Sequence, residues 1–146
     1  MAKSYVAAPR HARANRTLLK MKPAISILQN AIRILGVVLI VLGFLFWTGH
    51  ALELVRFHMS LGFALVVLLW ILAGIGTRAG LQPWVLISAS LWGLLVIVFG
   101  MTMGTLLPGR SHELIRVLHF LIGLGAIALS ESVAARIKRR TQVKQP

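Results

Sequence analysis

The chain contains no cysteine, a single tyrosine and only three acidic residues among 146. Without cysteine it forms no disulfide and offers neither a thiolate ligand for a metal or iron–sulfur cluster nor a cysteine nucleophile. Charged residues make up 13% of the chain, against roughly 25% in a typical soluble domain. The sequence also has no nucleophile beside a base, no phosphate-cradling glycine loop and no HExxH motif. These absences argue against a soluble hydrolase or transferase.

Apolar residues are abundant instead, at 58% of the chain with a mean hydropathy of +0.83. Three runs without acid, lysine or arginine cover residues 34–52, 57–77 and 79–109. The shortest would rise about 28 Å as a helix at about 1.5 Å per residue, close to the ~30 Å hydrocarbon thickness of a bilayer. A fourth run, 117–130, is too short unless it extends to residue 135 and includes Glu131.

We therefore predict an all-α integral membrane protein, a bundle of four transmembrane helices. The predicted spans are about 30–49, 54–77, 83–106 and 113–135. They form a transmembrane domain at 23–137, between a basic N-terminal arm at 1–22 and a basic tail at 138–146. The arm has six basic residues and no acid, so we expect it to be mobile rather than folded.

The distribution of basic residues predicts the orientation of the helices. With four spans both termini lie on one side, and all sixteen Lys and Arg except Arg56, Arg110 and Arg116 fall on that side. The positive-inside rule then places both termini in the cytoplasm of a multi-pass protein of the cell (plasma) membrane. The basic arm and tail should attract anionic lipid headgroups rather than nucleic acid. A helix–helix partner or a homo-oligomer is also compatible with the sequence.

The two halves of the chain resemble each other. The segment GVVLIVLG at 36–43 matches GLLVIVFG at 93–100, an offset of 57 residues. The segment ELVR at 53–56 matches ELIR at 113–116, and a histidine follows each. This pattern indicates a tandem duplicated helical hairpin. In two hairpins of the same orientation, equivalent residues lie at the same membrane depth.

One charged residue falls inside the fourth span. A charge within a span usually has a partner, and Arg33 in the first span lies toward the same side of the membrane as Glu131. We predict a structural ion pair between Arg33 and Glu131. The alternative is an interfacial Glu131 that is solvated by headgroup water or by Arg136.

The equivalent histidines His58 and His119 are the main candidates for a functional site. Two neutral imidazoles that face each other inside a bundle are able to supply both axial ligands of a b-type haem. Glycines nearby would make room for the macrocycle, and arginines would pair with its propionates. These residues are Gly43, Gly62, Gly100 and Gly123, and Arg56 and Arg116. The alternative is that the histidines are ordinary interface residues and the glycines allow close helix packing.

This layout resembles the four-helix cores of membrane b-type cytochromes, in which histidines on spanning helices bind haem. Members with two haems carry a second histidine pair near the opposite face, and no histidine lies in the inner half of these predicted spans. The resemblance implies at most one haem, and electron transfer or a place in a redox complex. Because the sequence lacks catalytic motifs, we expect no catalytic activity of the chain's own.

Two further functions fit the same sequence. Met59, Met101 and Met103 join four histidines toward the outer face, His50, His58, His112 and His119. Thioether and imidazole ligands suit copper, especially the cuprous ion. The other alternative is a cofactor-free scaffold or accessory subunit that binds partner helices.

Overall fold

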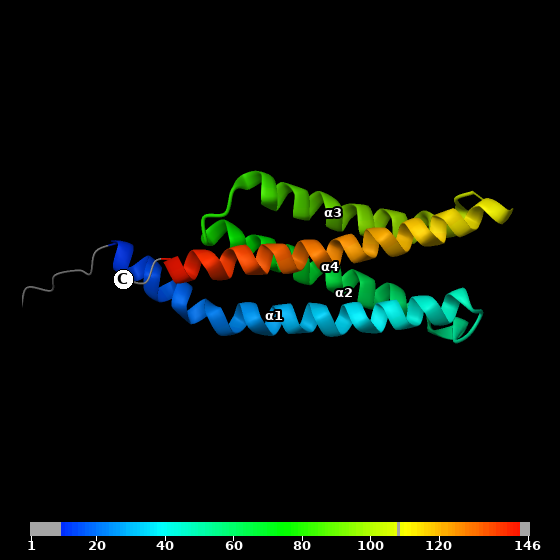
Figure 1. Ribbon diagram of the computed structural model, residues 1–146, viewed down its shortest axis with the longest axis horizontal. Coiled ribbons are helices and arrows are strands. Elements are labelled where there is room, and N and C mark those ends of the chain that lie inside the picture. The colour runs from blue at the N-terminus through cyan, green and yellow to red at the C-terminus, as the bar shows by residue number, and fades with distance from the viewer. Residues whose placement is uncertain (1–9, 108, 144–146) are drawn as a thin grey trace, which may run out of the picture.

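The computed structural model describes residues 10–107 and 109–143, and within these ranges it is a bundle of four long helices with no strand. The helices are α1 (Arg10–Trp47), α2 (Val55–Arg78), α3 (Pro83–Thr102) and α4 (His112–Val143). Short 3₁₀ turns cover Leu52–Leu54, Met103–Thr105 and Gly109–Ser111. The helices lie side by side along the long axis of the molecule (Figure 1). The predicted all-α fold and its four-helix bundle are confirmed.

Four segments, one at each long helix, are long and apolar enough to cross a membrane. These segments are Pro23–Trp47, Leu52–Arg78, Pro83–Thr105 and His112–Arg140. Large apolar side chains point outward from all four helices, among them Ile34 at 66% exposure and Leu91 at 62%. A surface of this kind is unfavourable in water and suits lipid tails. The fold is therefore compatible with a multi-pass membrane protein.

The N-terminal part of α1 differs from the expected arm. The helix begins at Arg10 and continues through Pro23, so residues 10–22 are helical. Extending an existing helix costs less than nucleating a new one, and Arg, Leu, Lys and Met are good helix formers. The first turns incline to the rest of α1 (Figure 1), as a proline inside a helix favours.

At the other end of the chain, α4 continues beyond the predicted fourth span to Val143, so the basic tail is helical as far as that residue. Residues 1–9 of the expected arm and 144–146 of the expected tail lie outside the described residues.

Helix α3 begins at Pro83. A proline is favourable at this position because the first N–H groups of a helix have no partner within the helix, so the N–H that proline lacks is not missed.

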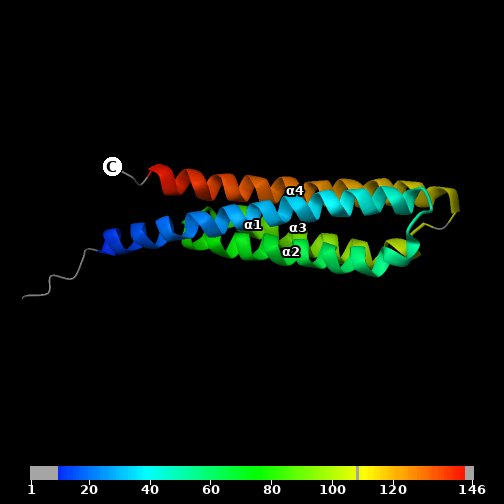
Figure 2. The same cartoon turned by 90° about the horizontal axis from the view of Figure 1, so that it is seen from below.

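The helices are arranged with approximate twofold symmetry. Helices α2 and α4 contact each other across the bundle and each also packs against α1 and α3, whereas α1 and α3 lie apart within the described residues. The start of α1, the end of α4 and the α2–α3 turn lie at one end of the bundle, the terminal end. The α1–α2 and α3–α4 connections lie at the other, the hairpin end (Figures 1 and 2).

The packing of the two hairpins repeats the duplication seen in the sequence. A Cβ atom added at Gly36 would lie 2.7 Å from Cδ1 of Ile127, and one at Gly93 would lie 2.9 Å from Cγ1 of Val66. Gly93 follows Gly36 by 57 residues and Ile127 follows Val66 by 61, the offsets of the repeat. The same close approach of a glycine to a branched side chain therefore occurs twice.

The buried core is concentrated toward the terminal end. Its side chains are Ile25, Ile32, Leu69, Leu72, Ala73, Ala79, Leu81, Val85, Ala89, Val133, Ala134 and Ile137. Toward the hairpin end fewer side chains are enclosed, chiefly Leu42, Leu65, Ile115 and Ile122. The tips of the two hairpins also diverge there in Figure 1. The hairpin half of the bundle is thus the more loosely filled half.

Candidate functional site

His58 of α2 and His119 of α4 face each other in the hairpin half of the bundle. Their ring centroids lie 6.3 Å apart with 47° between the ring planes. The approximate symmetry accounts for this contact. Across a twofold axis each residue meets its own counterpart, and α2 and α4 are the helices that meet at the axis. The structure therefore brings together the two histidines that the repeat makes equivalent.

Nδ1 of each ring is buried and has no hydrogen-bond partner among the described residues. The preceding histidine of each repeat, unlike His58 and His119, does have a partner for its Nδ1 atom. Nδ1 of His50 lies 3.0 Å from Oγ1 of Thr48, and Nδ1 of His112 lies 3.2 Å from the carbonyl oxygen of Leu106. Buried polar atoms are rarely unpaired, so the His58 and His119 nitrogens need an explanation.

A phenylalanine from each neighbouring helix packs against the histidine pair. The ring of Phe46 on α1 meets His58 edge to face with centroids 5.3 Å apart. The ring of Phe99 on α3 stacks on His119 at 6.2 Å with 14° between the planes. No sequence motif marks these two phenylalanines, although each lies within one turn of a candidate glycine, Gly43 or Gly100. The two rings make the surroundings of the imidazoles apolar.

The four candidate glycines differ in what surrounds them. A Cβ added at Gly100 would lie 3.5 Å from Cε1 of His119, so Gly100 borders the histidine pair directly. At Gly43, Gly62 and Gly123 no heavy atom lies within 4 Å of the added Cβ. Those three half-buried glycines leave patches of helix surface that no side chain covers.

The two candidate arginines are not equivalent. Arg116 is three residues before His119 and therefore shares its helix face, and its Nη1 lies 3.0 Å from Oε1 of Glu113. Arg56 is two residues before His58, a spacing that places two side chains on different faces of a helix, and it is exposed. Only Arg116 is therefore directed to the same side of its helix as the histidine it precedes.

The residues considered for copper are more dispersed. Met59 and Met101 are 49% and 70% exposed. Among the described residues no group of three or more histidine, aspartate or glutamate side chains is close enough to hold a metal ion. The structure adds no support to the copper hypothesis.

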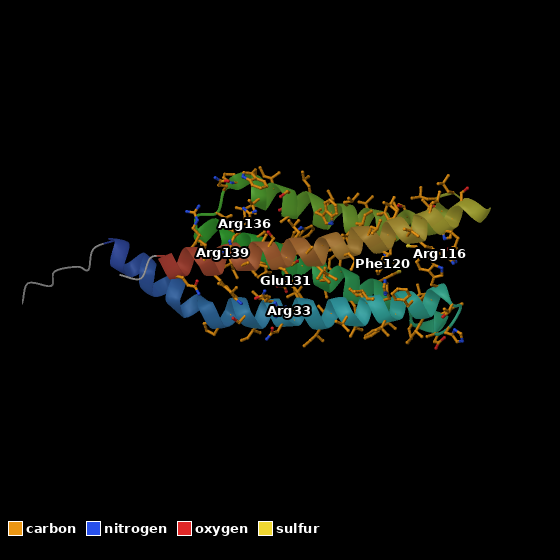
Figure 3. All side chains as sticks on the ribbon, in the orientation of Figure 1. Arg33, Arg116, Phe120, Glu131, Arg136 and Arg139 are labelled. Atoms are coloured by element: carbon orange, nitrogen blue, oxygen red, sulfur yellow. The ribbon has the colours of Figure 1, made fainter. Side chains whose placement is uncertain are left out.

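A polar network joins α1 and α4 closer to the terminal end. Nε of Arg33 lies 2.7 Å from Oε1 of Glu131, and Nη2 lies 2.9 Å from Oε2 (Figure 3). Gln29 donates a hydrogen bond to Glu131, and Lys138 donates one to Gln29. The structure thus brings together the predicted pair and adds two residues that sequence reasoning missed. Helical spacing could have indicated them, because Gln29 is one turn before Arg33 and Lys138 is two turns after Glu131, on the same helix faces as the ion pair.

The alternative partner of Glu131 makes other contacts. The guanidinium of Arg136 lies 5.6 Å from the ring centroid of Trp84 on α3, and its Nε lies 3.4 Å from Oγ of Ser132. Arg136 therefore connects α4 to α3, not to the network on α1.

The opposite face of the bundle carries no ion pair at the corresponding place. The repeat offsets make Trp70 of α2 equivalent to Glu131, and Ser90 of α3 equivalent to Arg33. Nε1 of Trp70 donates to the carbonyl oxygen of Ser90 at 3.3 Å. The two halves of the molecule thus share a backbone arrangement but differ in chemistry at this position.

The histidine pair and the polar network each bring polar side chains of different helices together inside the apolar spans. Comparison of the chain with protein-family models, with curated proteins and with solved structures finds no match.

Proposed function

We propose that the protein binds one b-type haem between His58 and His119 and transfers electrons, alone or as a subunit of a redox complex. The observation that carries this proposal is the pair of facing imidazoles, with ring centroids 6.3 Å apart, whose buried Nδ1 atoms have no hydrogen-bond partner among the described residues. A haem held by two histidines supplies one-electron redox chemistry. The chain's own part is to hold, orient and shield that group.

The separation of the rings suits a metal ion between them. Two metal–nitrogen bonds of about 2 Å and the half-width of each ring, about 1 Å, together span about 6 Å. The observed distance between the centroids is 6.3 Å. The spacing of His58 and His119 is therefore close to what two ligands of one iron would need.

The surroundings of the pair suit a flat, largely apolar group. Phe46 and Phe99 cover the imidazoles, and the helix surface at Gly43, Gly62 and Gly123 is free of side chains. The hairpin half also has fewer enclosed side chains than the terminal half. Arg116 is the arginine placed to pair with a propionate, and Glu113 would compete with the propionate for it.

We also propose that both termini face the cytoplasm of a cell membrane, as the distribution of basic residues favours. The hairpin end and the histidine pair would then lie toward the outer surface. A single haem at this depth would exchange electrons with a donor and an acceptor on that side, because one haem does not span the bilayer.

The absorption spectrum of the purified protein tests the haem proposal. Protein from haem-replete cells, in detergent, should show a Soret band and a sharp α-band after reduction. His58→Ala and His119→Ala should each lose or shift these bands, because each removes one axial ligand. His50→Ala and His112→Ala are matched controls, since they remove the histidines near the start of each repeat's second helix, whose Nδ1 atoms already have partners.

Two outcomes would contradict the proposal. One is a colourless wild-type protein, which would favour a cofactor-free scaffold. The other is a haem spectrum that His58→Ala and His119→Ala leave intact. Metal analysis of the same samples would detect copper in place of iron.

A further inference from the structure

The ion pair on the α1–α4 face is exposed near the terminal end of the predicted spans. Arg33 is three residues after the start of the span predicted at 30–49, about 5 Å at about 1.5 Å per residue, a depth close to the lipid headgroups. The side chains of Arg33 and Glu131 are 57% and 31% exposed. Charged groups that face lipid tails are costly, so this face needs a polar or charged occupant.

The excess of positive charge in the terminal half indicates which charge the occupant should carry. Glu131 is the only acidic residue there, because Glu53 and Glu113 lie at the hairpin end. Among the described residues, all Lys and Arg except Arg56, Arg110 and Arg116 belong to the terminal half. The occupant should therefore carry negative charge. A second copy of the chain would bring the same excess of positive charge to the contact.

An apolar groove adjoins the charged site. Arg33, Ile34, Val37 and Val38 line a shallow depression of about 280 Å³ on the outward side of α1. Its lining is apolar, so Arg33 contributes the aliphatic part of its side chain, and the groove continues toward the hairpin end along side chains exposed by 36% to 66%. A cationic group at one end of an apolar groove matches a molecule with an anionic head and a hydrocarbon chain.

We propose that the α1–α4 face binds one anionic phospholipid, with its phosphate on Arg33 and an acyl chain along Ile34, Val37 and Val38. The pair with Glu131 uses Nε and Nη2 of Arg33, which leaves Nη1 to donate to a phosphate oxygen. Lys138, two turns along α4 from Glu131, adds positive charge on the side from which the headgroup would enter. This site is independent of the haem.

The opposite face of the bundle serves as an internal control. At the equivalent position of α2 and α3 the structure has Trp70 and Ser90, which carry no charge. That face should therefore show no preference for anionic lipid, and one bound lipid per chain is the expected stoichiometry.

Lipid retention by the full chain tests the proposal. Delipidated protein in detergent is titrated with phosphatidylglycerol or phosphatidylcholine, and bound lipid is counted by native mass spectrometry. The wild type should retain one phosphatidylglycerol in preference to phosphatidylcholine. Arg33→Gln combined with Glu131→Gln, which keeps the net charge, should lower this affinity about fivefold. Val37→Trp, which fills the groove, should lower it without any change of charge.

Arg78→Gln is the control, because it removes a positive charge from the end of α2, on a different helix from the site. It should retain the wild-type preference. Equal binding of the two lipids, an equal loss in Arg78→Gln, or wild-type binding by both site variants would overturn the proposal. So would a dimer that occupies the face, or inorganic phosphate that displaces the lipid. Circular dichroism of each variant confirms that it is folded.

Discussion

Gly93 shows how a single missing side chain sets the distance between two helices. A Cβ at this position would lie 2.6 Å from Nε1 of Trp70 and 2.9 Å from Cγ1 of Val66. Gly93→Val should therefore push α3 away from α2 and destabilise the fold by about 1–3 kcal/mol. Gly74→Val is the matched control, since no heavy atom lies within 4 Å of its Cβ position. Thermal unfolding in detergent measures both, and equal stability of the two variants would contradict the prediction.

The sequence predicts the partner of a charged side chain best when the span contains few residues of the opposite charge. Glu131 is the only acid in the inner half of the predicted spans, so Arg33 was its natural partner. Gln29 and Lys138 were missed because glutamine and lysine are common near helix ends and their direction depends on the rotation of each helix. The direction of Arg56 could have been predicted, because a spacing of two residues separates it from the face of His58.

The α2–α3 turn is the element that depends most directly on one glycine. Gly80 has φ +75°, and the N–H groups of Gly80 and Leu81 bond the carbonyl oxygens of Thr77 and Gly76, both at 3.0 Å. The turn thereby ends α2 and buries Ala79 and Leu81 in the core of the terminal half.

Gly80→Ala should destabilise the protein by about 1–2 kcal/mol, because a residue with a Cβ strains this left-handed backbone. Gly104→Ala is the control, since Gly104 is not among the positive-φ residues and its Cβ position is open. Unfolding followed by helical circular dichroism in mixed micelles compares the two variants. A loss in Gly104→Ala that equals the loss in Gly80→Ala would show that the turn geometry is unimportant.

The sequence predicted all four helices correctly but placed their ends less accurately. Apolar runs predicted all four, and Pro83 marked the start of α3. The run from Arg10 to Lys22 is too polar for a span but still helix-forming, so α1 extends beyond the bilayer segment. Hydropathy reports where a chain is apolar, whereas a helix ends where its backbone hydrogen bonds end.

At the scale of the whole molecule the duplication is the most informative feature. The offset between His58 and His119 predicted equal depth, but not that α2 and α4 would be the diagonal pair that meets at the symmetry axis. Had α1 and α3 met there instead, the same sequence repeat would have placed the two histidines apart. The concentration of the core at the terminal end was also not visible in the sequence, since both halves of each span are similarly apolar.

The orientation of the whole molecule is testable because the chain has no cysteine. His50→Cys places one thiol at the hairpin end, and Gln82→Cys and Gln142→Cys each place one at the terminal end, all at exposed positions. The excess of Lys and Arg at the terminal end should hold it in the cytoplasm. A membrane-impermeant maleimide should then label His50→Cys in intact cells and the other two only after permeabilisation.

The opposite labelling pattern would move the histidine pair to the cytoplasmic side and the lipid site to the outer leaflet, which is poor in the anionic lipids that attract polybasic segments. Labelling of both ends in intact cells would contradict a single orientation. Labelling of Gln82→Cys without Gln142→Cys would mean that α3 and α4 do not both cross the bilayer. Only the first pattern keeps the basic end, the ion pair and the proposed anionic lipid on the same side of the membrane.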